Sequence, residues 1–91
     1  MFMTKTTMEC RSVAELLQRL AHGAPRLSLR EGVNPAMSTV ERIAKAAGRS
    51  ATLTELGLAC NALGDGGVAA LLRHVAGSAA LVRLDLAGNG I

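Results

Sequence analysis

The stretch Leu53-Thr-Glu-Leu56-Gly-Leu58-Ala-Cys-Asn61-Ala-Leu63 decides the fold of this chain. It returns 28 residues later as Leu81-Val-Arg-Leu84-Asp-Leu86-Ala-Gly-Asn89-Gly-Ile91. Both copies have the pattern L-x-x-L-x-L-x-x-N-x-L/I, with every apolar and Asn position filled. A fixed period of this length indicates a repeat protein, in which each unit packs mainly against its neighbours.

Amphipathic helices are predicted between these stretches. Ser12 and Glu15 have the spacing of a capping box, as do Ser38 and Glu41, and Asp65 is the expected cap of a third helix. The apolar stripes at helical spacing are Val13, Leu16, Leu17 and Leu20; Val40, Ile43, Ala44 and Ala47; and Val68, Leu71, Leu72 and Val75. The expected ends of the three helices are Gly23, Gly48 and Gly77.

Each predicted helix is followed by a stretch with strand period, at residues 26–30, 55–59 and 83–87. Stacked units would pair these strands in parallel on one wall and place the helices on the other. Asn61 and Asn89 follow their strands, where a short amide can bond backbone groups of the turn and of the next unit, so a structural Asn ladder is predicted. In the first unit Gly32 stands at the ladder position and Asn34 is displaced by two, which predicts an irregular turn.

The segment Leu63-Gly-Asp-Gly-Gly-Val-Ala-Ala-Leu71-Leu72, between two such stretches, resembles the ribonuclease-inhibitor type of leucine-rich repeat, which also occurs in NOD-like receptors. The resemblance covers residues 12–91. It implies a right-handed α/β solenoid, a short horseshoe of about three repeats that ends inside a repeat, with parallel strands on the concave face and helices on the convex face. Residues 1–11 lack a period and are predicted to be a flexible tail with no role in the fold.

The resemblance also implies a non-enzymatic role in protein–protein recognition. The residues expected to bind a partner on the concave face are Arg26, Ser28, Arg30, Glu55, Gly57, Arg83 and Asp85. Arg26, Glu55 and Arg83 would form a row of alternating charge, which is equally a favourable cross-strand pattern without a binding role. Two alternatives remain open. One is self-association through the C-terminal end, where Leu84, Leu86 and Ile91 are expected to be exposed, and the other is regulation of a GTPase.

Composition argues against several other functions. The net charge is +3, with eight Lys or Arg against four Glu in residues 1–49 and two Arg against three acidic residues in 50–91. This small surplus, together with the absence of Trp and Tyr, disfavours nucleic-acid binding. Cys10 and Cys60 form neither a disulfide framework nor a metal motif, so no metal or cofactor is expected.

No catalytic motif is present either. Gly64-Asp-Gly-Gly67 lacks the Gly-Lys-Ser/Thr of a phosphate-binding loop, and His22 and His74 suit helix C-termini better than metal sites. The N-terminus has no signal-peptide pattern and no stretch has membrane-spanning length, so a cytoplasmic location without membrane binding is expected.

Overall fold

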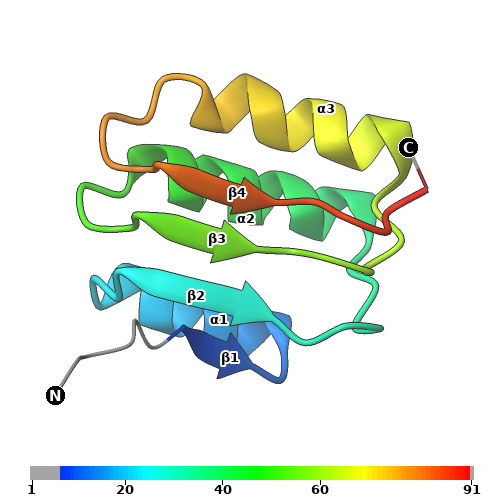
Figure 1. The fold of residues 1–91 in the computed structure, drawn as a ribbon, viewed down its shortest axis with the longest axis horizontal. Coiled ribbons are helices and arrows are strands. Elements are labelled where there is room, and N and C mark those ends of the chain that lie inside the picture. The colour runs from blue at the N-terminus through cyan, green and yellow to red at the C-terminus, as the bar shows by residue number, and fades with distance from the viewer. Residues whose placement is uncertain (1–6, 91) are drawn as a thin grey trace, which may run out of the picture.

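The computed structural model of the chain describes residues 7–90. The elements, in order, are β1 (Met8–Cys10), α1 (Val13–Ala21), β2 (Arg26–Leu29), α2 (Met37–Arg49), β3 (Glu55–Gly57), α3 (Gly64–Val75) and β4 (Arg83–Asp85). Within this described part the four strands are parallel and lie in the order β1-β2-β3-β4. Figure 1 shows the helices together behind the sheet, so the front of the sheet is open. The prediction of an α/β fold with a parallel sheet is confirmed.

The core lies between the sheet and the helices. Alternate strand residues Leu27, Leu29, Leu56 and Leu58 are at most 3% exposed, because the two-residue period of a strand turns them all to the helix side. They belong to one cluster with the helix residues Leu16, Leu20, Val40, Ile43, Ala44, Ala47, Val68, Leu71 and Val75. The predicted apolar stripes therefore build the core, although Leu72 is half exposed.

Part of the segment predicted to be a flexible tail, residues 1–11, forms strand β1 of the sheet. Met8, Glu9 and Cys10 pair with Leu27, Ser28 and Leu29 of β2, and the Cys10 side chain is completely buried. The prediction for residues 1–11 is thus wrong from Met8 onward, and residues 1–6 lie outside the described part. The repeat period could not reveal β1, because Cys10 precedes its partner Leu29 by 19 residues rather than 28.

The first predicted capping box forms with one change, because the Glu15 carboxylate bonds the N–H of Arg11 and not that of the cap residue Ser12. The N–H of Glu15 donates to the Ser12 hydroxyl over 3.1 Å, and the Glu15 carboxylate accepts from the N–H of Arg11 over 2.8 Å. Glu15 also pairs with Arg19 at 3.2 Å. The backbone bond from Arg11, followed by the bond from Arg19, lowers the pKa of Glu15 below its ordinary value.

The other two predicted caps are wrong. Helix α2 starts at Met37 with Ala36 as its cap, because the Ala36 carbonyl already accepts from the N–H groups of Thr39 and Val40. Ser38 and Glu41 therefore lie within the helix and make no cap bond. Helix α3 is capped by Leu63, and Asp65 lies in the first turn, where a carboxylate suits the positive end of the helix dipole.

Gly48 was predicted to end its helix, and this prediction is wrong. The residue lies inside α2 and allows close packing on α3. A Cβ atom at this position would lie 2.4 Å from the His74 carbonyl oxygen. The absent side chain is what lets the two helices approach each other. Helix α2 ends one residue later, at Arg49.

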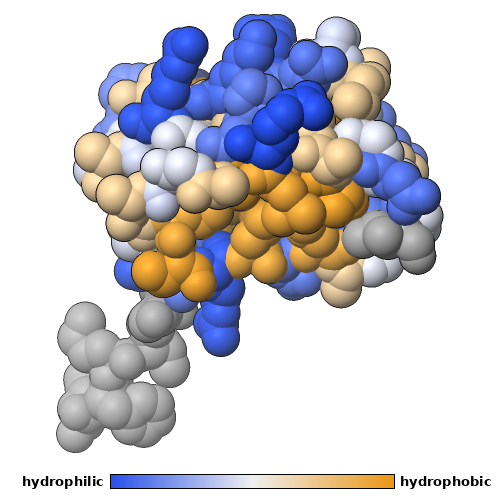
Figure 2. Space-filling model, turned by 90° about the horizontal axis from the view of Figure 1, so that it is seen from above, coloured by the Kyte–Doolittle hydropathy of each residue, from blue (hydrophilic) through white to orange (hydrophobic). Residues whose placement is uncertain are grey.

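The end of the molecule formed by α3 and β4 carries apolar side chains. Figure 2 looks down on this end and shows them gathered in one patch. Leu72 is 50% and Val82 79% exposed, and the partly buried Leu81, Leu84 and Leu86 pack against the core. Leu84 and Leu86 are therefore less exposed than the sequence suggested. Ile91 lies outside the described residues.

Candidate functional site

The open face of the sheet carries two rows of side chains that cross the strands. In the first row, Arg26, Glu55 and Arg83 are register partners on β2, β3 and β4. In the second row, Glu9, Ser28, Gly57 and Asp85 are register partners on all four strands. Because side chains alternate between the faces of a strand, both rows lie on the side away from the helices.

The first row has the alternating charge that the sequence predicts. Glu55 is only 8% exposed, and its carboxylate lies 3.8 Å from the guanidinium of Arg83, whose side chain is 73% exposed. With one partner so exposed, the ion pair stabilises the fold by less than about 1 kcal/mol. Its main effect is to compensate the charge of the buried Glu55 carboxylate.

Two shallow depressions lie along these rows. The first, of about 180 Å³, is lined by Thr7, Leu27, Ser28, Glu55, Leu56, Gly57, Arg83 and Asp85. The second, also of about 180 Å³, is lined by Glu9, Ser28, Leu29, Glu31, Gly57, Ala59 and Asp85, and we call it the acidic trough. The trough follows the whole second row. Its floor is low because Gly57 has no side chain and Ser28 beside it is small.

The structure brings most of the predicted binding residues together. Ser28, Glu55, Gly57, Arg83 and Asp85 line the first depression, and Arg26 joins the first row by register. Arg30 is exposed just after the end of β2 and lies outside both depressions.

The sequence analysis missed three residues of this face: Thr7, Glu9 and Glu31. Thr7 and Glu9 were missed because they belong to the segment assigned to a tail. The one available signal was the alternation of exposed Glu9 with apolar Met8 and Cys10, which is too short to predict a strand by itself.

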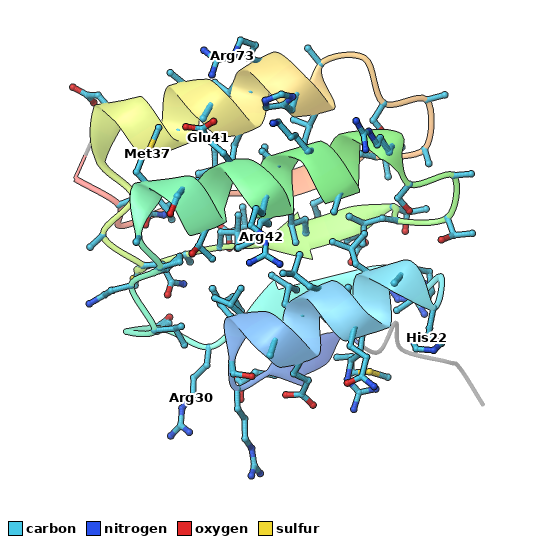
Figure 3. All side chains as sticks on the ribbon, turned by 180° about the vertical axis from the view of Figure 1, so that it is seen from behind. His22, Arg30, Met37, Glu41, Arg42 and Arg73 are labelled. Atoms are coloured by element: carbon cyan, nitrogen blue, oxygen red, sulfur yellow. The ribbon has the colours of Figure 1, made fainter. Side chains whose placement is uncertain are left out.

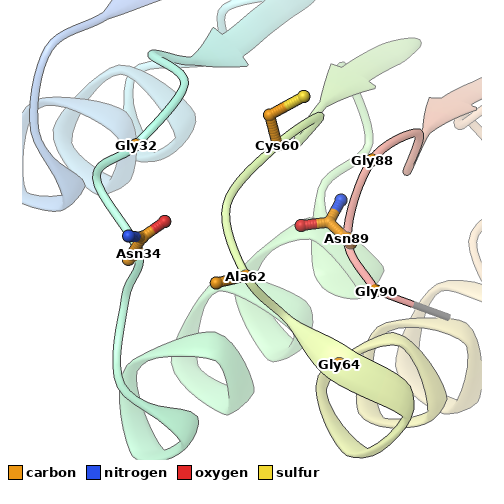
Figure 4. Close-up of a pocket in the computed structure, with 8 residues that line it drawn as sticks. All are labelled: Gly32, Asn34, Cys60, Ala62, Gly64, Gly88, Asn89 and Gly90. Atoms are coloured by element: carbon orange, nitrogen blue, oxygen red, sulfur yellow. The ribbon is translucent and has the colours of Figure 1, made fainter.

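The turns that follow the strands form a third and larger hollow, of about 560 Å³ (Figure 4). Asn89 lines this hollow, and both Asn89 and Asn61 are buried. The Asn89 side-chain oxygen accepts from the N–H groups of Asn61 (2.8 Å) and Leu63 (3.2 Å), and its amide nitrogen donates to the carbonyls of Leu58 and Leu86, both at 2.9 Å. The Asn61 oxygen accepts from the N–H of Asn34 at 3.1 Å. The amides thus connect neighbouring turns.

Backbone conformation shows where the first turn departs from the others. Left-handed residues recur 28 positions apart, as Gly32, Cys60 and Gly88, and again as Asn34, Ala62 and Gly90. Residue 33 therefore occupies the place of Asn61 and Asn89. The ladder position of the first unit is Val33 rather than Gly32, because its turn contains one more residue after the strand. A valine has no polar group to continue the amide bonds.

The described residues offer no metal site and no membrane-spanning helix. Within residues 7–90, no three His, Cys, Asp or Glu side chains are grouped to hold a metal ion, and no helix is long and apolar enough to cross a membrane. His22 Nδ1 lies 2.7 Å from the Gln18 carbonyl at the end of α1. Burial, followed by the charge of Glu15, raises the pKa of the Cys10 thiol, whereas Cys60 is exposed.

Comparison with protein families gives one match. Residues 49–72, which include β3 and most of α3, match the family model described as Leucine Rich repeat. The match supports a leucine-rich repeat. Such repeats are generally modules for protein interaction, and they are typically non-enzymatic. No curated protein and no solved structure gives a significant match to the chain.

Proposed function

We propose that this chain is a non-enzymatic scaffold that binds a protein partner through the open face of its sheet. In this proposal the strands line the concave side of a short right-handed horseshoe of the ribonuclease-inhibitor type, and the protein acts in the cytoplasm. The single observation that carries the proposal is the pair of rows on the open face. Both rows lie on the side away from the helices and follow the same register from strand to strand, and apart from Gly57 all of their residues are polar or charged.

The opposite side of the molecule is less suited to recognition. Helices cover that face of the sheet, and Figure 3 shows Glu41, Arg42 and Arg73 there as separate side chains on the outer surfaces of α2 and α3. A polar outer face is what any amphipathic surface helix presents to water. It therefore needs no binding role to explain it.

Site-specific photocrosslinking tests the proposal. The variants Ser28→p-benzoylphenylalanine, on the open face, and Arg73→p-benzoylphenylalanine, on the helix face, are irradiated in extract from the source cells. We expect a discrete adduct from position 28 that excess unlabelled chain suppresses, and none from position 73. Adducts from position 73 alone would overturn the proposal. For a partner identified in this way, reversing the charge of both Arg26 and Arg83 is expected to weaken binding.

A second candidate function is self-association through the α3 and β4 end, which the exposed Leu72 and Val82 favour. Its test is sedimentation velocity across a wide range of concentration, followed by interference because the chain has no Trp or Tyr. A sedimentation coefficient that rises with concentration for the wild type, but not for Val82→Lys, would support it. A constant monomer would exclude it.

A further inference from the structure

The acidic trough differs in charge from the rest of the open face. Its lining contains three carboxylates, from Glu9, Glu31 and Asp85, and no Lys or Arg. The chain as a whole has a net charge of +3. The trough therefore has the larger surplus of negative charge, since the first depression contains two carboxylates and one Arg.

The carboxylates of the trough also differ from Glu55 in their partners. Glu55 is paired with Arg83. Among residues 7–90, Asp85 forms no ion pair, and its Oδ1 accepts a hydrogen bond only from the N–H of Ala87, at 3.1 Å. Glu9 likewise has no ion pair within the described part. These two carboxylates are available to a cation from outside the chain.

The two carboxylates stand at opposite ends of the trough. Glu9 lies on β1 and Asp85 on β4, so three strand spacings of about 4.8 Å separate them, or about 14 Å. In their register row, only Ser28 and Gly57 lie between them. A Cβ at Gly57 would come within 3.0 Å of the Ser28 Cβ, so the middle of the trough is kept low by the absence of that atom. A backbone can cross here without meeting a large side chain.

We infer that the trough binds an extended segment of the partner protein that carries two basic side chains four residues apart. An extended chain advances about 3.3 Å per residue, so residues i and i+4 are about 13 Å apart and point to the same side. One Lys or Arg would then face Glu9 and the other would face Asp85, while Glu31 adds to the negative charge of the trough. This inference rests on the proposed function, because it assigns the chemistry of the partner to that same surface.

The ionic contacts would be partly open to water, since the trough is shallow. They would therefore weaken with added salt. Neither contact alone is expected to dominate the affinity. The specificity would come from the spacing of the two cations and from the low floor between them. The segment can lie close to this floor only if its middle residue, which points to the same side as the two cations, has a small side chain.

A random peptide library displayed on phage tests the inference. Peptides are selected on the wild-type chain and then depleted on the variant Ser28→Trp, which fills the middle of the trough from a solvent-facing position. The peptides that remain depend on the open face. We expect them to share two basic residues separated by three others. Circular dichroism of Ser28→Trp verifies that the variant is folded.

Affinities of a selected synthetic peptide then locate the contacts. We expect Asp85→Asn and Glu9→Gln each to weaken binding by about three- to tenfold, and the double variant by more. The matched control Glu41→Gln, on the helix face, should leave the affinity unchanged. Replacing the peptide residue opposite Asp85 by norleucine should cost affinity on the wild type and much less on Asp85→Asn.

The possible failures are distinguishable. Peptides that require the open face but lack basic residues, or that bind the Asn and Gln variants as well as the wild type, overturn the inference and leave the proposed function standing. If every selected peptide binds Ser28→Trp as tightly as the wild type, the open face is not the recognition surface, and both the inference and the proposed function fail.

Discussion

The Asn89 side chain makes the densest set of hydrogen bonds in the described part of the fold, so Asn89→Ala is the sharpest perturbation of the repeat. The substitution removes the oxygen that accepts from the N–H groups of Asn61 and Leu63. It also removes the donor to the Leu58 and Leu86 carbonyls. Asn89 is 2% exposed, so bulk water cannot replace these bonds without opening the turn.

The cost follows from the number of groups left without a partner. A buried donor without an acceptor costs about 1–3 kcal/mol, and an under-satisfied carbonyl costs less. Two N–H groups and two carbonyls therefore predict a loss of about 3–5 kcal/mol. Asn61→Ala leaves one N–H, that of Asn34, and one carbonyl, that of Ala59, without their side-chain partner. We therefore expect it to lower the free energy of unfolding by about 1–3 kcal/mol. A domain of this size has a total stability of about 5–14 kcal/mol.

Urea unfolding followed by circular dichroism measures both effects, since the chain has no Trp or Tyr for fluorescence. Sodium sulfate keeps the weaker variant folded at the start of the titration. Asn34→Gly is the matched control: it retains the N–H that Asn61 accepts, and glycine suits the φ of 52° at this position, so its stability should change little. A loss below about 1 kcal/mol for Asn89→Ala, or a larger loss for Asn61→Ala, would refute the reasoning.

Further predictions concern two glycines and the two cysteines. Gly48→Ala should destabilise the fold by about 1–3 kcal/mol in the same urea assay, because its Cβ would overlap the His74 carbonyl. Gly66→Ala should instead stabilise it by up to about 1 kcal/mol, because the atom nearest to the new Cβ, in Met37, is 4.0 Å away. Equal effects of the two substitutions would contradict this packing. Iodoacetamide at pH 8 should alkylate the exposed Cys60 in the native chain and Cys10 only in denaturant, because burial raises the pKa of Cys10 and blocks access. Mass spectrometry of samples taken at successive times measures the two alkylation rates. Equal rates for Cys60 and Cys10 in the native chain would contradict the prediction. The neutral Cys10 thiol should stabilise the fold fully below its ordinary pKa of 9.0, and this contribution should decline as pH rises above that value.

The sequence predicted the elements that repeat and missed those that do not. The spacing of Leu27, Leu56 and Leu84 predicts the register of β2, β3 and β4, and the structure pairs these three residues. A period works here because each unit must bury the same apolar side against its neighbour. Strand β1 has no counterpart 28 residues away, so periodicity could not identify it.

The ends of helices α2 and α3 were mispredicted for a local reason. Ser38 and Asp65 are good capping residues, but a cap needs its own backbone to leave the helix at that point. The Ala36 carbonyl starts α2 earlier, and Leu63 starts α3 earlier. Gly48 was taken as a helix stop, although its role is to admit the neighbouring helix. Propensity alone cannot distinguish a glycine that ends a helix from one that packs against another.

The size of a hollow does not decide which surface binds a partner. The turn hollow is about three times as large as the acidic trough, but several of its polar groups are already used within the fold. The N–H groups of Gly32, Cys60 and Gly64 donate to neighbouring turns, and the buried Asn89 amide is bonded at both of its polar atoms. A ligand there would have to displace bonds that hold the repeats together. The open face instead offers Glu9 and Asp85, whose ionic interactions are not satisfied within the described chain, on strands that the core already holds in register. Recognition at that face would add contacts without breaking any, and this is the physical reason for our proposal that a partner binds there.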